Sequence, residues 1–257
     1  MYWKTLAREL GIPEAAIAAM EALEPAPRDA LDRPDRYAPE DPRGLRRLKT
    51  YLTLARDTRE QYARLGIPDS VFLASFQDFP IWCRDYAAKH GAAGVSELSW
   101  LARTVRCGLF RLGRLQFEPL VLEKPLGGHA AGTPVLEVHI PAEAPLEPEA
   151  VLASFAQAPG FFRRHFAAEY SLCHCHSWLL SPALQEILPA DSRILRFQSL
   201  FDVVDTDQQE RQAEERVFGF VSDDPAAYPG HTSLQRAMKD YLLRGGALSM
   251  GQGLRRL

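Results

Sequence analysis

The chain has 257 residues and a formal net charge of −3, with 46% hydrophobic and 25% charged residues. This composition is typical of a folded globular protein of one or two domains and excludes a disordered or fibrous chain. The slightly acidic charge balance gives no reason to expect a nucleic-acid partner.

The first hundred residues predict a helical lobe. Within it, a segment with five prolines at 24–44 is expected to form an extended connector. Arg43, Arg46, Arg47 and Lys49 are expected on a solvated helix face. The predicted helices are Trp3–Leu10, Pro13–Leu23, Leu45–Leu65, Asp69–Phe79, Pro80–His90 and Ser96–Thr104.

After Arg106 the pattern changes to alternating strands and helices, which predicts an α/β chain with a mixed α+β sheet. The arginines at 255 and 256 are expected in a solvated C-terminus. We therefore divide the chain into domains at 1–105 and 106–257. The second domain is predicted to contain a hairpin at 109–117 turning at Gly113, strands at 135–141 and 170–178, a helix at 147–166, helical turns at 182–188 and 192–201, strands at 203–204 and 217–220, and a helix at 232–243.

The strand at 135–141 carries two proton-accepting side chains. Successive residues of a strand point to opposite faces, so Leu136, Val138 and Ile140 are expected to face a core. Glu137 and His139 then share the other face. A carboxylate and an imidazole side by side on a rigid element are candidates for general base catalysis.

The strand at 170–178 places His174 and His176 on one face together with Tyr170. With His139 from the neighbouring strand, these histidines would supply three ligands for zinc in a metal-dependent hydrolase. The favoured interpretation is that they are partly buried imidazoles with backbone or carboxylate partners, so no metal is expected. Cys175 beside them is a nucleophile candidate, but its position in the middle of a strand fits packing better.

Four strings in the chain resemble a bacterial acyltransferase family that joins a helical N-acyltransferase N-terminal domain to a GNAT-like C-terminal domain. These strings are Phe110–Glu118 (FRLGRLQFE), His139–Pro141 (HIP), Cys175–Pro182 (CHSWLLSP) and Ser192–Phe201 (SRILRFQSLF). The resemblance extends from about Leu45 onward. It implies a GNAT-like acyltransferase fold preceded by a helical N-terminal lobe.

The resemblance also implies acyl-CoA as co-substrate. The strands at 135–141 and 170–178 would be the fourth and fifth strands of the GNAT sheet, between which such folds hold the thioester. The pyrophosphate would rest on the following loop, and the implied cofactor-binding residues are Val138, Ile140, Ala142, Glu143 and Ala144. This loop lacks the usual glycine-rich run and has Glu143 where the family usually has glycine, a carboxylate that disfavours an anion.

The implied activity is transfer of an acyl group from acyl-CoA to a small amine by direct attack. Glu137 or His139 would act as the base, Tyr170 would donate a proton, and backbone N–H groups near Val138–Ile140 would bind the oxyanion. The departure at Glu143 leaves a catalytically inactive GNAT-like binding or regulatory module as the alternative.

The remaining expectations concern the compartment. Four cysteines with neither a zinc-ribbon nor a disulfide-framework spacing indicate a reducing cytoplasm. Charges near Met1 break the apolar core that a signal peptide needs, and no run of about 18 apolar residues occurs. We therefore expect a cytoplasmic protein with no membrane partner.

Overall fold

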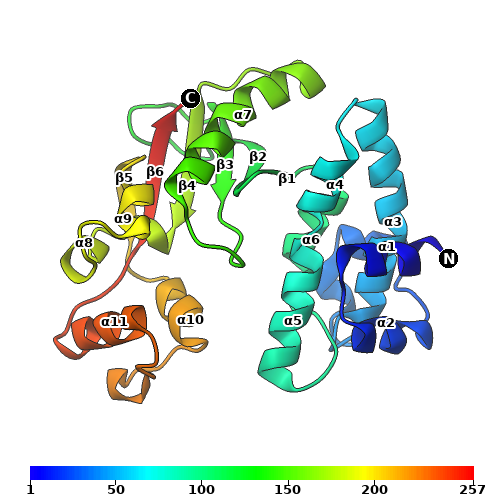
Figure 1. Cartoon of the computed structure of the whole chain (residues 1–257), viewed down its shortest axis with the longest axis horizontal. Coiled ribbons are helices and arrows are strands. Elements are labelled where there is room, and N and C mark those ends of the chain that lie inside the picture. The colour runs from blue at the N-terminus through cyan, green and yellow to red at the C-terminus, as the bar shows by residue number, and fades with distance from the viewer. The chain divides into compact units, whose positions relative to one another are not determined.

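The computed structural model of the chain describes residues 1–257. Helices dominate the first part of the chain and a six-stranded sheet with flanking helices the second, which confirms the predicted α/β class (Figure 1). The chain clusters into two compact units. The first contains Met1–Phe117 and Arg163–Ala167, and the second contains Glu118–Phe162 and Ala168–Leu257.

All six predicted helices of the first unit are present, with ends shifted by a few residues. In the longest, α3, the buried residues Leu48, Leu52, Ala55 and Tyr62 recur at helical spacing and form one apolar face. The helices are α1 (Tyr2–Leu10), α2 (Glu14–Glu21), α3 (Leu45–Arg64), α4 (Asp69–Ser75), α5 (Asp78–His90) and α6 (Leu98–Val105).

The prediction of an extended connector at 24–44 is wrong. This segment contains two 3-10 helices, η1 (Arg28–Leu31) and η2 (Pro34–Tyr37). It is tied to α3 by a buried ion pair in which Nε of Arg47 lies 3.1 Å from Oδ2 of Asp41. The prolines of this segment led us to expect an extended chain. Instead, side chains of α3 form hydrogen bonds with the segment and stabilise its compact conformation.

The expected solvated basic face is also wrong for two of its members. Arg47 and Lys49 are buried, at 7% and 9% exposure. Nζ of Lys49 donates to the carbonyl oxygens of Met20, in the last turn of α2, and Leu23, just after that helix. A cation near the C-terminus of a helix is favoured by the carbonyl dipoles there.

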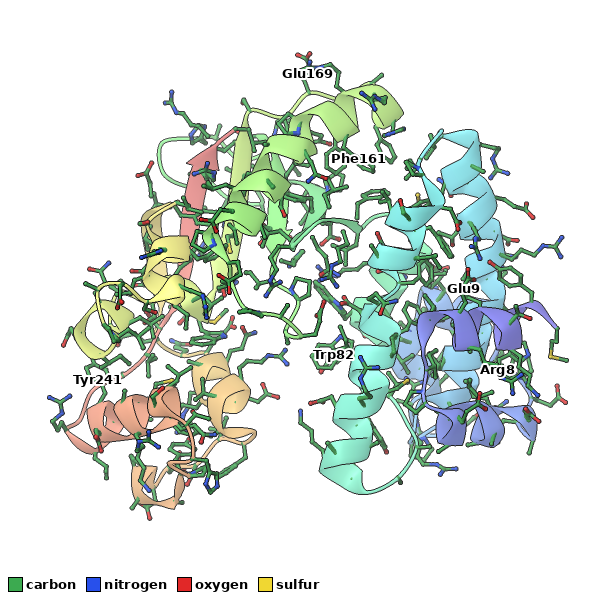
Figure 2. All side chains as sticks on the ribbon, viewed as in Figure 1. Arg8, Glu9, Trp82, Phe161, Glu169 and Tyr241 are labelled. Atoms are coloured by element: carbon green, nitrogen blue, oxygen red, sulfur yellow. The ribbon has the colours of Figure 1, made fainter.

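The end of α1 is fixed by two ion pairs on its surface. Arg8 and Glu9 lie near the end of α1 (Figure 2). Arg8 pairs with Glu14 of α2, while Glu9 accepts two hydrogen bonds from Arg59 of α3, at 2.9 and 3.1 Å. Arg59 also donates to Asp69 at the start of α4. One guanidinium thus links three helices, although each exposed pair contributes at most about 1 kcal/mol.

The sheet contains six strands in the order β1-β2-β3-β4-β6-β5. The hairpin turning at Gly113 is confirmed, but residues 217–220 are not a strand because Val217 and Phe218 end helix α10. None of the helices combines the length and hydrophobicity that a membrane span requires. The strands are β1 (Phe110–Leu112), β2 (Leu115–Val121), β3 (Pro134–His139), β4 (Leu172–Ser177), β5 (Asp202–Asp207) and β6 (Met250–Arg256).

Strand β6 was not predicted, and the expectation of a solvated C-terminus holds for Arg256, which is exposed, but not for Arg255, which is partly buried. Arg255 lies within this strand, which pairs antiparallel with both β4 and β5. Its glycines have a low strand propensity, so the sequence pattern did not indicate a strand, but close packing requires glycine at these positions. A Cβ on Gly251 would lie 2.5 Å from the carbonyl oxygen of Leu180, so only glycine lets that segment approach the sheet.

One face of β4 and β6 is covered by helix α7 (Pro148–Phe166). Arg255 lies opposite Cys173 in the sheet, and its guanidinium sits 4.6 Å from the ring centroid of Phe155 on α7. Pro159 lies inside α7 without ending it. The opposite face carries an apolar cluster of Leu122, Leu126, Val135, Leu172 and Leu254.

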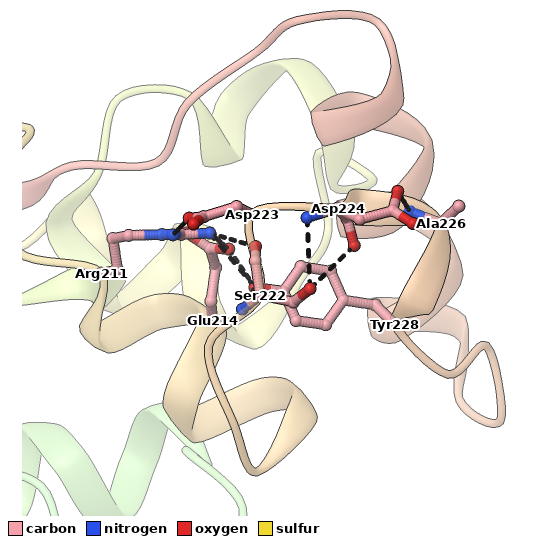
Figure 3. A network of polar contacts seen from close by, with 7 residues as sticks. All are labelled: Arg211, Glu214, Ser222, Asp223, Asp224, Ala226 and Tyr228. Atoms are coloured by element: carbon pink, nitrogen blue, oxygen red, sulfur yellow. Dashed lines mark hydrogen bonds and ion pairs between the residues drawn. The ribbon is translucent and has the colours of Figure 1, made fainter.

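The remaining helices of the second unit form a separate apolar cluster around Tyr228 and Met238. Beside it, Arg211, Glu214, Asp223 and Tyr228 form a network of ion pairs and hydrogen bonds (Figure 3). These elements are η3 (Trp178–Leu180), α8 (Leu184–Ile187), α9 (Arg193–Gln198), α10 (Gln212–Phe218), η4 (Pro225–Ala227) and α11 (Ser233–Leu243).

Candidate active site

Strands β3 and β4 run parallel but are paired at only two positions. Leu136 lies opposite Cys173 and Glu137 opposite His174, and the pairing stops there. By contrast, β4 remains paired with β6 along its whole length, from Leu172 to Ser177. The second halves of β3 and β4 therefore part, and the ladder between them does not continue beyond Glu137.

Glu137 lies at the point where the two strands part, and its carboxylate bridges them. The side chain is 10% exposed. Oε2 accepts a hydrogen bond from Nδ1 of His174, and Oε1 accepts one from the backbone N–H of His176 at 3.2 Å. A buried carboxylate with both oxygens bonded is held in one orientation.

His139 belongs to a second imidazole–carboxylate pair. Its Nε2 lies 3.1 Å from Oε2 of Glu118 on β2, and the two side chains are 19% and 12% exposed. Glu137 and His139 are therefore on one face of β3, as expected, but each has its own partner on a different neighbouring strand. Sequence reasoning did not assign these partners, although the alternation along β4 already placed His174 and His176 on one face.

Both faces of β3 are buried, the expected core face and the face that carries Glu137. Val135 and Glu137 are buried, at 1% and 8% exposure, as are Leu136 and Val138. Parallel strands are usually covered on both faces, and β3 pairs parallel with β4. The interpretation of His174 as a partly buried imidazole with a carboxylate partner is confirmed, whereas the same expectation is wrong for His176, whose side chain is exposed.

Tyr170 lies away from the place where the strands part, and the side chain of Cys175 lies on the opposite face of the sheet. Tyr170 precedes β4 at its opposite end, and its ring packs edge-on against Phe162 with centroids 5.4 Å apart. Cys175 is completely buried, and this burial raises the pKa of its thiol well above the usual value. Because residues alternate along β4, its side chain points away from the face that carries His174.

The loop predicted to bind the pyrophosphate follows β3 directly and leads into α7, which begins at Pro148. Within it, Ala142 and Glu143 are exposed and Ala144 is partly buried. Glu147, just before the helix, pairs with Arg193 at the start of α9, at 3.1 Å. The loop thus carries two negative side chains near a helix N-terminus, and the guanidinium beside Glu147 is engaged by that carboxylate.

The three histidines considered as zinc ligands are not gathered. No group of three or more histidine, cysteine, aspartate or glutamate side chains is arranged to hold a metal ion. Instead, His139 faces Glu118 and His174 faces Glu137. The side chains therefore form two separate acid–imidazole pairs.

Comparison with protein-family models shows which family the chain belongs to. The family described as GNAT-like C-terminal domain matches residues 109–255, and the N-acyltransferase N-terminal domain matches residues 1–107. The chain belongs to this acyltransferase family. The parting of β3 and β4 is the feature that the resemblance led us to expect of a GNAT-like sheet.

Solved structures agree with this family. An acyltransferase in complex with decanoyl-CoA and teicoplanin is 27% identical to this member, with a TM-score of 0.83, over 98% of this chain and 87% of that chain. An acyltransferase in complex with CoA and 10C-teicoplanin gives the same values. A further complex with decanoyl-CoA is 28% identical, with a TM-score of 0.74, over 82% of this chain and 65% of that chain. No curated protein matches by sequence.

Proposed function

We propose that this protein is an acyl-CoA-dependent N-acyltransferase. The observation that carries the proposal is the limited pairing of β3 with β4, which ends at Glu137 and His174 within a GNAT-like domain. A gap between strands leaves backbone N–H groups able to bind a thioester oxyanion. The acyl-CoA complexes of the similar structures support the choice of donor.

The thioester would lie beside Val138 and Ile140, with its pyrophosphate near Ala142–Ala144. The N-terminus of α7 supplies a positive dipole end to this loop, which favours an anion. Glu143 opposes it. We therefore expect Glu143→Gly to tighten acyl-CoA binding and Ala144→Trp to weaken it by obstruction.

We propose that the acceptor is an amine, and the experiment must distinguish a small amine from a large one. Two of the similar acyltransferase structures hold teicoplanin or its 10C form, and teicoplanin is a large glycopeptide. An acceptor panel should therefore contain small amines, amino sugars and teicoplanin itself. The four free cysteines support the reducing cytoplasm as the proposed compartment.

Binding of the donor is tested first. Acetyl-, octanoyl- and decanoyl-CoA should each be titrated while thermal unfolding is followed. A ligand at a hundred times its Kd stabilises the folded state by about 2.7 kcal/mol. Ala144→Trp should abolish the shift, whereas Ala227→Trp, at an exposed position in η4, should retain it. No shift with any acyl-CoA at millimolar concentration would refute the proposal.

Turnover is tested second, by release of free CoA thiol in the presence of each amine. The runner-up is an inactive acyl-CoA-binding module, which Glu143 in the pyrophosphate loop favours. That module would bind acyl-CoA without releasing thiol for any acceptor in the panel. Amine-dependent thiol release with matching amide formation would exclude it.

A further inference from the structure

His174 has one ring nitrogen held and the other left without a partner. Nδ1 faces Oε2 of Glu137, while Nε2 is buried and makes no hydrogen bond. An ionised carboxylate only accepts hydrogen bonds, so the proton of a neutral His174 resides on Nδ1. Nε2 then carries a lone pair, which is the state that a general base requires.

Glu137 fixes this state through a second contact. Its Oε1 accepts the backbone N–H of His176 at 3.2 Å, so the carboxylate is anchored to the same strand that carries the imidazole. Glu137 and His174 also form the last paired row before the strands part. The pair is therefore placed where the gap begins, with Glu137 acting as a positioning residue.

The second pair in this part of the sheet is arranged the other way round. His139 turns Nε2, the nitrogen at the tip of its ring, toward Glu118 at 3.1 Å. Its tip is thus engaged by a carboxylate, whereas the tip of His174 is not. The two pairs are chemically alike, so this difference in which nitrogen is held separates their roles.

We propose that Nε2 of His174 is the proton acceptor for the amine, with Glu137 orienting its ring. This inference rests on the proposed N-acyltransferase function. The lone pair of the amine forms the new bond to the thioester carbonyl carbon, and one proton of that nitrogen moves to Nε2. The C–S bond then breaks, its electron pair leaves with sulfur, and the imidazolium returns the proton to the thiolate. The products are an amide, free CoA thiol and neutral His174.

The decisive variant is His174→Asn. The amide nitrogen of asparagine can replace Nδ1 as donor to Glu137, but nothing replaces Nε2. We expect kcat to fall by about 100-fold or more, the usual contribution of a general base. Acyl-CoA affinity and the midpoint of thermal unfolding should stay near the wild-type values. His231→Gln, an exposed histidine outside the sheet, is the matched control.

A pH profile separates a catalytic role from a structural one. By strand register, the charged or titratable groups on the same face as His174 are Glu137 and His139 from β3, His176 on its own strand and Arg256 one row away on β6, where Leu254 lies directly opposite. Protonation of the imidazole removes its lone pair, so kcat/KM of the wild type should fall on the acid side. That limb should be absent in His174→Asn and present in His231→Gln.

Three results would overturn the assignment. The first is His174→Asn with wild-type kcat and pH profile. The second is loss of acyl-CoA binding in this variant, which would make His174 structural. The third is loss of the acid limb in His139→Gln with its retention in His174→Asn. Failure of the wild type itself to bind acyl-CoA would instead refute the proposed function, so the two failures are distinguishable.

Discussion

Glu214 is a buried carboxylate whose ionised form is stabilised by hydrogen bonds from Arg211 and Tyr228. Arg211 donates to both of its oxygens at 2.6 and 2.7 Å, and the hydroxyl of Tyr228 donates to Oε2. Burial raises the pKa of Glu214, but the hydrogen bonds from Arg211 and Tyr228 outweigh burial, and the net pKa lies below its usual value. The folded state therefore binds the proton less readily than the unfolded chain does.

Tyr228→Phe tests this network. Removing a buried hydroxyl that bonds a charged group should lower the free energy of unfolding by about 1–3 kcal/mol at neutral pH. Because a lowered pKa stabilises the folded state only above the unfolded pKa, the wild type should lose this stability as pH falls through the folded pKa of Glu214. Chemical denaturation across pH checks it: a gap between the two proteins that does not narrow in acid would contradict the account.

At the scale of elements, two glycines differ in whether their surroundings have room for a side chain. Gly251 on β6 faces the backbone of Leu180 at a distance too short for a Cβ, whereas a Cβ added to Gly160 inside α7 would have no heavy atom within 4 Å. A glycine inside a helix costs conformational entropy without packing benefit. One glycine is thus required by contact and the other is replaceable.

Alanine substitution should separate them. Gly251→Ala should lower the free energy of unfolding by about 1–3 kcal/mol, because the new methyl group would clash with the backbone of Leu180 in η3. Gly160→Ala should raise it by about 0.5–1 kcal/mol. Urea denaturation of the two variants measures both changes, and a stabilised Gly251→Ala would show that η3 moves freely.

These elements also explain how far the sequence could predict the fold. Periodicity identified the six N-terminal helices and the strands that became β3 and β4, because their apolar residues repeat regularly. It missed β6, whose glycines satisfy a tertiary contact rather than a strand preference. It named Glu137 and His139 as site candidates, but not which carboxylate faces which imidazole, since that depends on the register between strands.

For the whole molecule, the compact units and the family ranges divide the chain at different places. The two family matches meet between residues 107 and 109, whereas the first compact unit continues to Phe117 and includes 163–167. Phe110 shows why. Its fully buried ring lies 5.6 Å from the ring centroid of Tyr62 on α3 and 5.1 Å from that of Phe166.

Phe110→Ala should therefore damage the helical unit, although residue 110 lies in the range of the GNAT-like match. Loss of a buried phenylalanine ring costs about 3–5 kcal/mol. Hydrogen exchange followed by mass spectrometry should show faster exchange in α3 and α4. Phe201→Ala, in the second unit, serves as the comparison, and an identical exchange pattern in both variants would contradict this division.

The position of β6 has a consequence for synthesis of the protein. This strand lies between β4 and β5, yet it follows both of them along the chain. Until it emerges from the ribosome, two strand edges remain open, and open edges are sites of aggregation. The aspartates of β5, at 202, 205 and 207, place like charges on one of these edges, which disfavours its pairing with a second copy of itself. We therefore expect a chain in which β6 has not yet paired to associate less through β5 than through β4.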